Sequence, residues 1–173
     1  ETNWGGIWTP NGKNVAFSAE RNGSANIWLQ SADGSGSPEP LTQIPKALLL
    51  ADAFSPDGKQ LLITEIAASM NVKLLNIGSG AAPKQLLEGE FNKGNSQISP
   101  NGRWMAYESN ESGLLEIYVR PFPDVNTGRW QISRDGGTRP LWNKNGREIF
   151  YFLPPGTMMS VPVETGTSFK AGD

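Results

Sequence analysis

The side chains best suited to chemistry are the carboxylates of the third quarter of the chain: Glu108, Glu111, Glu116 and Asp124. Two carboxylates on either side of a glycosidic bond can hydrolyse it, one as the acid and one as the base or nucleophile. However, we expect Glu111 in a loop, Glu116 at the start of a strand and Asp124 in a later turn. Because carboxylates in proteins are mostly exposed, the sequence favours solvated surface charges over a catalytic pair.

Histidine and cysteine are both absent from the sequence. The chain therefore has no Ser-His-Asp triad, no Cys-His pair, no disulfide and no metal site built on thiolate or imidazole. Histidine is also the commonest general base in enzymes. We therefore expect that the chain is not an enzyme, and that it carries no cofactor and no metal.

Two loops have residue types that bind ions in other proteins. Residues 124–128 offer oxygen ligands at alternate positions, but a calcium site needs about six to eight oxygens and usually a bidentate Glu, which does not follow here. A turn between two strands is the favoured interpretation. Residues 134–139 are rich in glycine, contain two arginines and could hold an anion on backbone amides. Because the phosphate-loop pattern is missing, we interpret them as a connection between two repeats.

The elements that must position these residues follow an internal repeat. Four related segments have their turn glycines at positions 12, 58, 102 and 146, so the period is 44 to 46 residues. Each has Ser, Thr or Asn three residues before the glycine; the first three then have Pro, which is Lys144 in the fourth. These residue types predict a tight turn. The structural residues of the motif are Pro10, Gly12, Pro56, Asp57, Gly58, Pro100, Gly102 and Gly146. Turn formation accounts for Asp57 without catalysis, since its three counterparts are Asn.

The residues that flank each turn predict strands. Positions three and five after each turn glycine are apolar and share one face of a strand. The position between them is also apolar, which predicts a strand buried on both sides. The residues at that position are Ala16, Leu62, Ala106 and Phe150. With a second strand after each hairpin and a more polar outer strand, every repeat predicts a four-stranded antiparallel sheet, and we expect almost no helix.

A four-stranded unit repeated about every 40–45 residues is typical of a β-propeller. We therefore predict an all-β fold: a β-propeller, or a fragment of one, with four four-stranded antiparallel blades in one domain. The blades are expected at residues 1–45, 46–90, 91–134 and 135–173. Residues 168–171 alone could begin the outer strand of the fourth blade, so we expect that strand to be incomplete.

Three tryptophans could form an aromatic platform for a sugar: Trp104, Trp130 and Trp142. Trp142 occupies the repeat position of Trp8, so we assign it to the core. Trp130 is expected on a peripheral strand and half exposed. Because indole rings bury a large apolar area, packing between blades is favoured over sugar binding.

The repeat resembles the WD-like β-propeller repeat of bacterial TolB-like proteins. The third and fourth repeats look most like the propellers that follow Ser/Thr kinase domains in some bacteria. This resemblance rests on residues 98–103, 109–113, 118–123, 128–133 and 136–151. It covers nearly the whole chain and implies the fold more than the function. Similar propellers precede the catalytic domain of prolyl-oligopeptidase-like peptidases, whose catalytic residues lie outside the propeller.

From the residues and this resemblance we expect a non-catalytic module that binds protein or ligand within a larger bacterial sensor or TolB-like protein. A periplasmic or extracytoplasmic location is expected. Propellers bind with the loops of one face, because loops on a rigid scaffold carry function. The loop residues that we select are Arg21, Asn22, Asn110, Glu111, Arg134 and Arg139. Two alternatives remain: the propeller portion of a hydrolase or peptidase, and a structural arc that assembles with itself.

The partner that we expect is a protein, and a second copy of the chain is the favoured one. A four-bladed arc would expose the apolar faces of its first and last blades. It could close alone, form an eight-bladed ring with a second copy, or belong to a longer parent chain; the missing initial Met favours a processed or excised portion. A small ligand in the central channel is a further alternative. A net charge of −2 without a basic run argues against nucleic acid, and no apolar run is long enough for membrane insertion.

Overall fold

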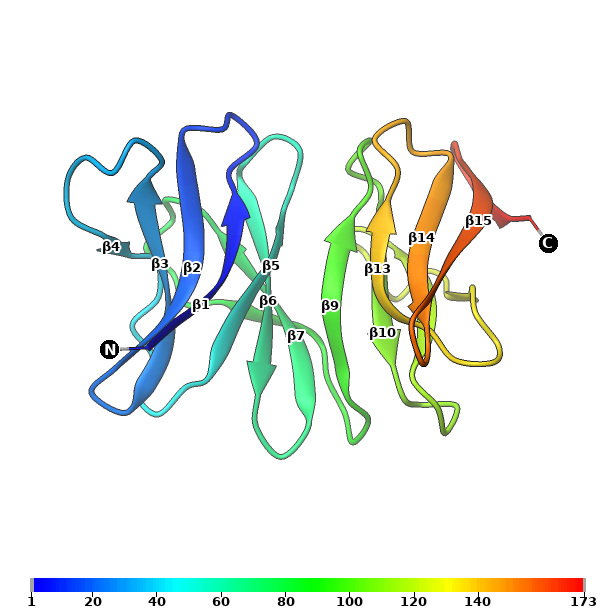
Figure 1. Cartoon of the computed structure of the whole chain (residues 1–173), viewed down its shortest axis with the longest axis horizontal. Helices are drawn as coiled ribbons and strands as arrows, with labels where there is room; N and C mark the ends of the chain where they lie inside the picture. The colour runs from blue at the N-terminus through cyan, green and yellow to red at the C-terminus, as the bar shows by residue number, and fades with distance from the viewer. Residues whose placement is uncertain (1, 173) are drawn as a thin grey trace. The chain divides into compact units, whose positions relative to one another are not determined.

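The computed structural model describes residues 2–172, which form strands joined by turns and loops (Figure 1). These residues make four four-stranded antiparallel sheets, and no helix occurs among them. No segment in this range could cross a membrane as an apolar helix. The predicted all-β class and the four-stranded repeat are confirmed.

Each sheet is a meander whose strands are neighbours both in sequence and in space. The first sheet contains β1 (Thr2–Trp8), β2 (Asn14–Arg21), β3 (Ser24–Ser31) and β4 (Glu39–Pro40). The second contains β5 (Leu49–Phe54), β6 (Gln60–Ile66), β7 (Met70–Asn76) and β8 (Lys84–Leu87). The third contains β9 (Lys93–Ile98), β10 (Trp104–Ser109), β11 (Glu116–Pro121) and β12 (Trp130–Gln131). The fourth contains β13 (Thr138–Trp142), β14 (Glu148–Leu153), β15 (Thr157–Thr165) and β16 (Phe169–Ala171).

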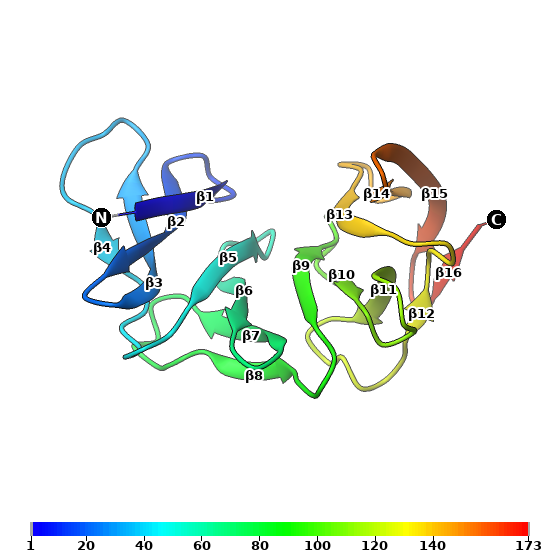
Figure 2. The ribbon, with the colours of Figure 1, turned by 60° about the horizontal axis from the view of Figure 1, so that its bottom comes forward.

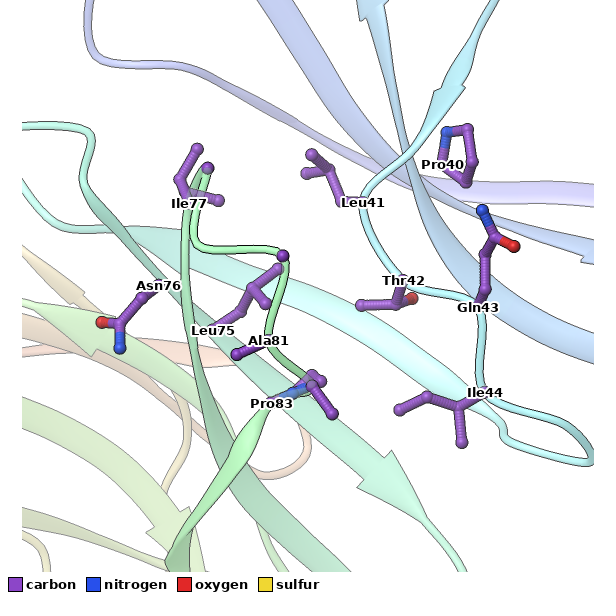
Figure 3. Close-up of a pocket in the computed structure, with 13 residues that line it drawn as sticks. Pro40, Leu41, Thr42, Gln43, Ile44, Leu75, Asn76, Ile77, Ala81 and Pro83 are labelled. Atoms are coloured by element: carbon purple, nitrogen blue, oxygen red, sulfur yellow. The ribbon is translucent and has the colours of Figure 1, made fainter.

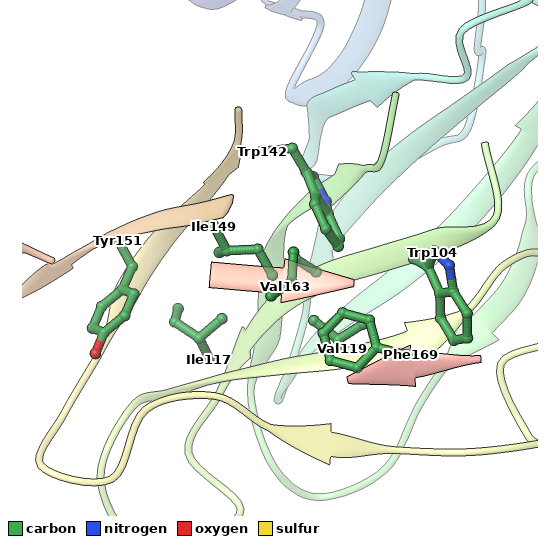
Figure 4. Close-up of a cluster of buried hydrophobic side chains, with 9 residues drawn as sticks. Trp104, Ile117, Val119, Trp142, Ile149, Tyr151, Val163 and Phe169 are labelled. Carbon is green, nitrogen blue, oxygen red and sulfur yellow. The ribbon is translucent and has the colours of Figure 1, made fainter. Parts of the chain in front are cut away.

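The chain divides into two compact units, Glu1–Glu88 and Gly89–Asp173. The first unit contains the first two sheets and the second unit contains the last two (Figure 2). Within each unit the sheets bury apolar side chains against one another. In the first unit this core consists of Ala16, Ile27, Leu49, Leu61, Ile63 and Leu75. In the second unit it consists of Trp104, Ala106, Ile117, Val119, Trp142, Ile149, Tyr151, Val163 and Phe169 (Figure 4).

The repeated turn has the same hydrogen bonds in the first three sheets, and Ser55 illustrates them. The Gly58 amide donates to the Ser55 carbonyl at 2.8 Å, and the Gln60 amide donates to the Ser55 hydroxyl oxygen at 3.0 Å. The Asp57 carboxylate accepts bonds from the Ser55 hydroxyl and the Lys59 amide, at 2.6 and 3.1 Å, and these bonds lower its pKa. Gly58 has a φ of 72°, a conformation that favours glycine. Asp57 therefore acts on the turn itself.

The outer strand of the fourth sheet differs from expectation. β16 pairs with β15 at Phe169, Lys170 and Ala171, and it is longer than the two-residue strands β4 and β12. Phe169 is 3 % exposed, and its ring lies 5.4 Å from those of both Trp104 and Trp130. The expectation of an incomplete fourth sheet was wrong, because burial of Phe169 against the third sheet holds this short strand in place.

Tryptophans at the same position of the repeat differ in how deeply they are buried. Trp142 is buried, as predicted, with 6 % of its surface exposed, whereas Trp8 at the same repeat position is 63 % exposed. Trp130 is half-buried and meets Trp104 edge to face, in agreement with the prediction. The difference arises because the third sheet packs against Trp142, while within residues 2–88 no sheet packs against Trp8.

Candidate functional site

A pocket of about 490 Å³ in the second unit is lined by a buried carboxylate together with several polar side chains. We call it the Glu108 pocket. It is lined by Asn95, Glu108, Thr138, Arg139, Phe152, Pro154, Pro155 and Gly156. Glu108 comes from β10, and its two main partners come from the innermost strands β9 and β13.

Glu108 is 7 % exposed, and both of its oxygens accept short hydrogen bonds. The Asn95 side-chain Nδ2 donates to Oε1 at 2.7 Å, and the Arg139 backbone amide donates to Oε2 at 2.8 Å. Asn95 and Arg139 both have left-handed backbones, with φ of 48° and 53°. Each lies at a register shift of its strand and seven residues before the turn glycine of its repeat. One buried carboxylate thus holds two strained bulges.

A second buried carboxylate, Glu116, organises the glycine-rich loop. It is 2 % exposed and accepts bonds from the Ser133 hydroxyl and, at 2.9 Å, from the Gly136 amide. The Gly137 amide donates to the Leu115 carbonyl at 2.7 Å. The loop is therefore a connection, as interpreted, and its amides bind groups of the chain itself. The prediction of solvated surface charge was wrong for Glu108 and Glu116, because each is enclosed by donors that neighbouring strands and loops supply.

The other two carboxylates of this region lie at the surface or in an ion pair. Asp124 is exposed, and its carbonyl accepts bonds from Thr127 in a turn. Glu111 forms an ion pair with Arg129, in which Oε2 and Nη1 are 2.9 Å apart. Burial lowers the pKa of the nearby Lys93 amine, while the negative charge of Glu111 opposes that shift.

The selected loop residues of the first unit have structural roles. Asn22 and Gly23 connect β2 to β3 with φ of 53° and 73°, the two positive values of a type I′ hairpin turn. The Arg21 guanidinium carbon lies 3.7 Å from the centre of the Trp28 ring, within cation–π distance. Arg21 and Asn22 also line an open pocket between the β2–β3 turn and the β4–β5 connection.

The selected loop residues of the second unit do not share one site. Asn110 accepts a bond from the Asn92 amide at 2.8 Å and so ties its loop to the start of β9. Glu111 is held by Arg129. Arg134 is exposed in the loop that leads to β13, and Arg139 lines the Glu108 pocket. Of the six selected residues, Arg139 alone lies in this pocket. Sequence reasoning missed Asn95, although its repeat position, shared with Arg139, was a usable signal.

A further pocket, of about 380 Å³, lies in the first unit (Figure 3). Leu41, Thr42 and Ile44 form one side, and Leu75, Ile77 and Pro83 form the other. No charged side chain lines it. Its polar side chains are the uncharged Thr42, Gln43 and Asn76.

No family model and no curated protein matches this sequence. Solved structures do match the fold. A putative TolB from Agrobacterium tumefaciens has a TM-score of 0.75 at 21 % identity, over 95 % of this chain and 58 % of that chain. TolB from Acinetobacter baumannii has a TM-score of 0.75 at 18 % identity, over 98 % of this chain and 43 % of its own. A puromycin-hydrolysing peptidase from Mycobacterium tuberculosis has a TM-score of 0.69 at 14 % identity, over 99 % and 28 %.

The chain spans little more than half of the putative TolB and less of the other two proteins. At such low identities the likeness concerns the fold and not the activity. The matches agree with the four four-stranded sheets. This chain is matched in fold by TolB β-propeller domains, as its repeat predicted.

Proposed function

We propose that the chain is a non-catalytic β-propeller module that binds protein through two unpaired sheet faces, and that the partner is a second copy of the chain. The carrying observation is that Trp8 is exposed on one face of the first sheet, and that Leu141, Phe152 and Met158 are exposed on one face of the fourth sheet. A TolB-like extracytoplasmic location is part of the proposal and is supported by the matching folds alone.

The first-sheet face consists of Trp8, Val15, Phe17 and Trp28. Trp8 pairs with Val15 across β1 and β2, and Phe17 pairs with Trp28 across β2 and β3, so all four side chains lie on one face. Trp8 is 63 % exposed, and the other three are half-buried. Ala16, on the opposite face, is fully buried against the second sheet.

The fourth-sheet face consists of Leu141, Phe150, Phe152 and Met158. Leu141 pairs with Phe150, and Phe152 pairs with Met158. Leu141, Phe152 and Met158 are 57 %, 45 % and 68 % exposed. An exposed cluster of this kind marks an interaction surface.

The contact between the third and fourth sheets supports a fit between the two faces. In the fourth sheet, the residues that correspond by repeat position to Trp8, Val15 and Phe17 are Trp142, Ile149 and Tyr151. These three are buried against Ala106 and other apolar residues of the third sheet. By the same correspondence, Phe150 occupies the repeat position of Ala106. This correspondence supports the pairing of the first-sheet face with the fourth-sheet face in the proposed dimer, with Phe150 in the place of Ala106.

A second copy supplies both faces, so two copies can each donate a fourth-sheet face and accept one. Such head-to-tail contacts form a closed assembly when the rotation between copies returns to the start. The small net charge of −2 puts little repulsion between copies. The non-catalytic assignment is supported by the state of Glu108 and Glu116, whose side chains are occupied by donors of the chain itself.

The mass of the chain in solution tests this proposal. Light scattering on the whole chain should give twice the chain mass of 18.7 kDa. Trp8→Glu and Met158→Glu should each yield monomers, because either change buries a charge in an apolar contact. The matched control is Leu114→Glu, which alters a 60 % exposed leucine in the β10–β11 loop and should leave the dimer intact.

Mixing the two monomeric variants adds a sharper test. The Trp8→Glu chain keeps its fourth-sheet face, and the Met158→Glu chain keeps its first-sheet face, so the mixture should form heterodimers through one intact contact. A monomeric wild-type chain, or equal dissociation by Leu114→Glu, would overturn self-association. Dimers that do not reform in the mixture would overturn the head-to-tail arrangement.

A second function has a specific observation behind it. The fold also matches the Mycobacterium tuberculosis peptidase, of which this chain would cover 28 %. In that case the chain would be the propeller portion of a peptidase, with its catalytic residues elsewhere. A peptidase assay tests this alternative. If it holds, a longer chain that includes this one should cleave peptide substrates, and the present chain alone should not.

A further inference from the structure

Arg139 presents a cation from a fixed backbone. Its amide is bound to the buried Glu108, its φ is 53°, and Pro140 follows it. The Arg139 side chain is exposed at the Glu108 pocket, and no hydrogen bond or ion pair to its guanidinium occurs within residues 2–172. A guanidinium without such partners can donate two parallel hydrogen bonds to the carboxylate of a ligand.

The backbone at the two bulges is left-handed, a conformation that is unfavourable for arginine. Glycine adopts a left-handed backbone at little cost, and Gly5, at the same repeat position of β1, has a φ of 59°. Asn95 and Arg139 occupy that position in β9 and β13, and arginine adopts a left-handed backbone less readily than glycine or asparagine does. The Asn95 side chain holds Glu108, whereas no bond within the described residues accounts for the Arg139 guanidinium, so a binding role is inferred for Arg139.

Asn95 supplies the complementary group. Its Nδ2 is committed to Glu108, which leaves its Oδ1 as an acceptor for an N–H of a ligand. Pro154 and Pro155 add apolar surface to the same pocket. The pocket thus combines a cation, an acceptor and an apolar wall.

The charge of Glu108 limits the ligand to a weakly charged anion. A phosphate dianion on Arg139 would be repelled by the Glu108 carboxylate, which is bound to the amide of the same residue, whereas a single carboxylate is repelled less. A peptide C-terminus carries one carboxylate, an adjacent amide N–H and a side chain. We propose that the Glu108 pocket binds the C-terminal residue of a peptide, with the carboxylate on Arg139 and the amide N–H on Asn95.

A pair of peptides tests the site. The probes are acetyl-Ala-Leu-Phe with a free carboxylate and the same peptide ended by a carboxamide, each titrated into the ¹⁵N-labelled whole chain and followed by NMR. We expect the free acid to shift the amides of Arg139 and Gly156, and the carboxamide to bind at least about tenfold more weakly, which corresponds to about 1.4 kcal/mol.

Three variants separate the site from the surrounding loop. Arg139→Gln should lose about tenfold in affinity for the acid, and Arg139→Gly should lose as much while relieving the backbone strain. Arg134→Gln, which removes an exposed arginine of the same loop, should bind as the wild type does. Equal binding of acid and carboxamide, no shift at Arg139, or an equal loss in Arg134→Gln would overturn the proposal. Repeating the titration on Trp8→Glu separates this outcome from that of self-association.

Discussion

Replacing Glu108 by alanine tests whether one buried carboxylate holds the two bulges. The change removes the acceptors of the Asn95 side chain and the Arg139 amide, which are bound at 2.7 and 2.8 Å. A hydrogen bond to a charged group contributes about 1.5–3 kcal/mol, so the loss of two such bonds predicts a destabilisation of about 3–6 kcal/mol. Glu108→Gln keeps one acceptor oxygen and should lose about half as much.

Urea unfolding followed by tryptophan fluorescence measures the total loss, and hydrogen exchange of the Arg139 amide measures it locally. The amide should be protected in the wild type and exchange fastest in Glu108→Ala. Glu164→Ala is the control, because its ion pair with Lys170 joins side chains that are 75 % and 70 % exposed and should contribute under about 1 kcal/mol. A Glu108→Ala loss below about 1 kcal/mol, or an unchanged Arg139 amide, would refute the reasoning.

Three further predictions concern the core, the pH dependence and the glycine-rich loop. Phe169→Ala should cost about 3–5 kcal/mol in urea unfolding, and a loss below about 1 kcal/mol would show that β16 contributes little. Burial raises the pKa of Tyr107 above its usual 10.0, so the fold loses stability as the pH rises above 10 and this group tends to ionise. Tyr107→Phe should therefore flatten the fall of the unfolding free energy above pH 10. An unchanged slope would contradict this prediction. Gly137→Ala would push a methyl group into the Ser133 hydroxyl and should cost about 1–3 kcal/mol by calorimetry, whereas Gly166→Ala, which meets nothing within 4 Å, should be nearly neutral; equal effects would refute the packing argument.

Much of the fold could be predicted because its signals are local. The turn at Ser55 depends on bonds between residues two to five apart, and the strands depend on alternating side chains. For the same reason the turn role of Asp57 could be predicted without any tertiary information. The candidate site could not be predicted in this way. The Arg139 amide that binds Glu108 lies 31 residues further along the chain, and from its sequence neighbours alone a single Glu is predicted to be a surface charge.

The period, the turns and the class of fold follow from the sequence alone, since each depends on neighbours within a few residues. Which faces and charges are buried depends on how the sheets pack. Trp8 and Trp142 are equivalent in the repeat, yet they are 63 % and 6 % exposed, because burial depends on whether another sheet packs against that face. Glu108 became the centre of a pocket for the same physical reason: its two donors come from strands that the fold brings together.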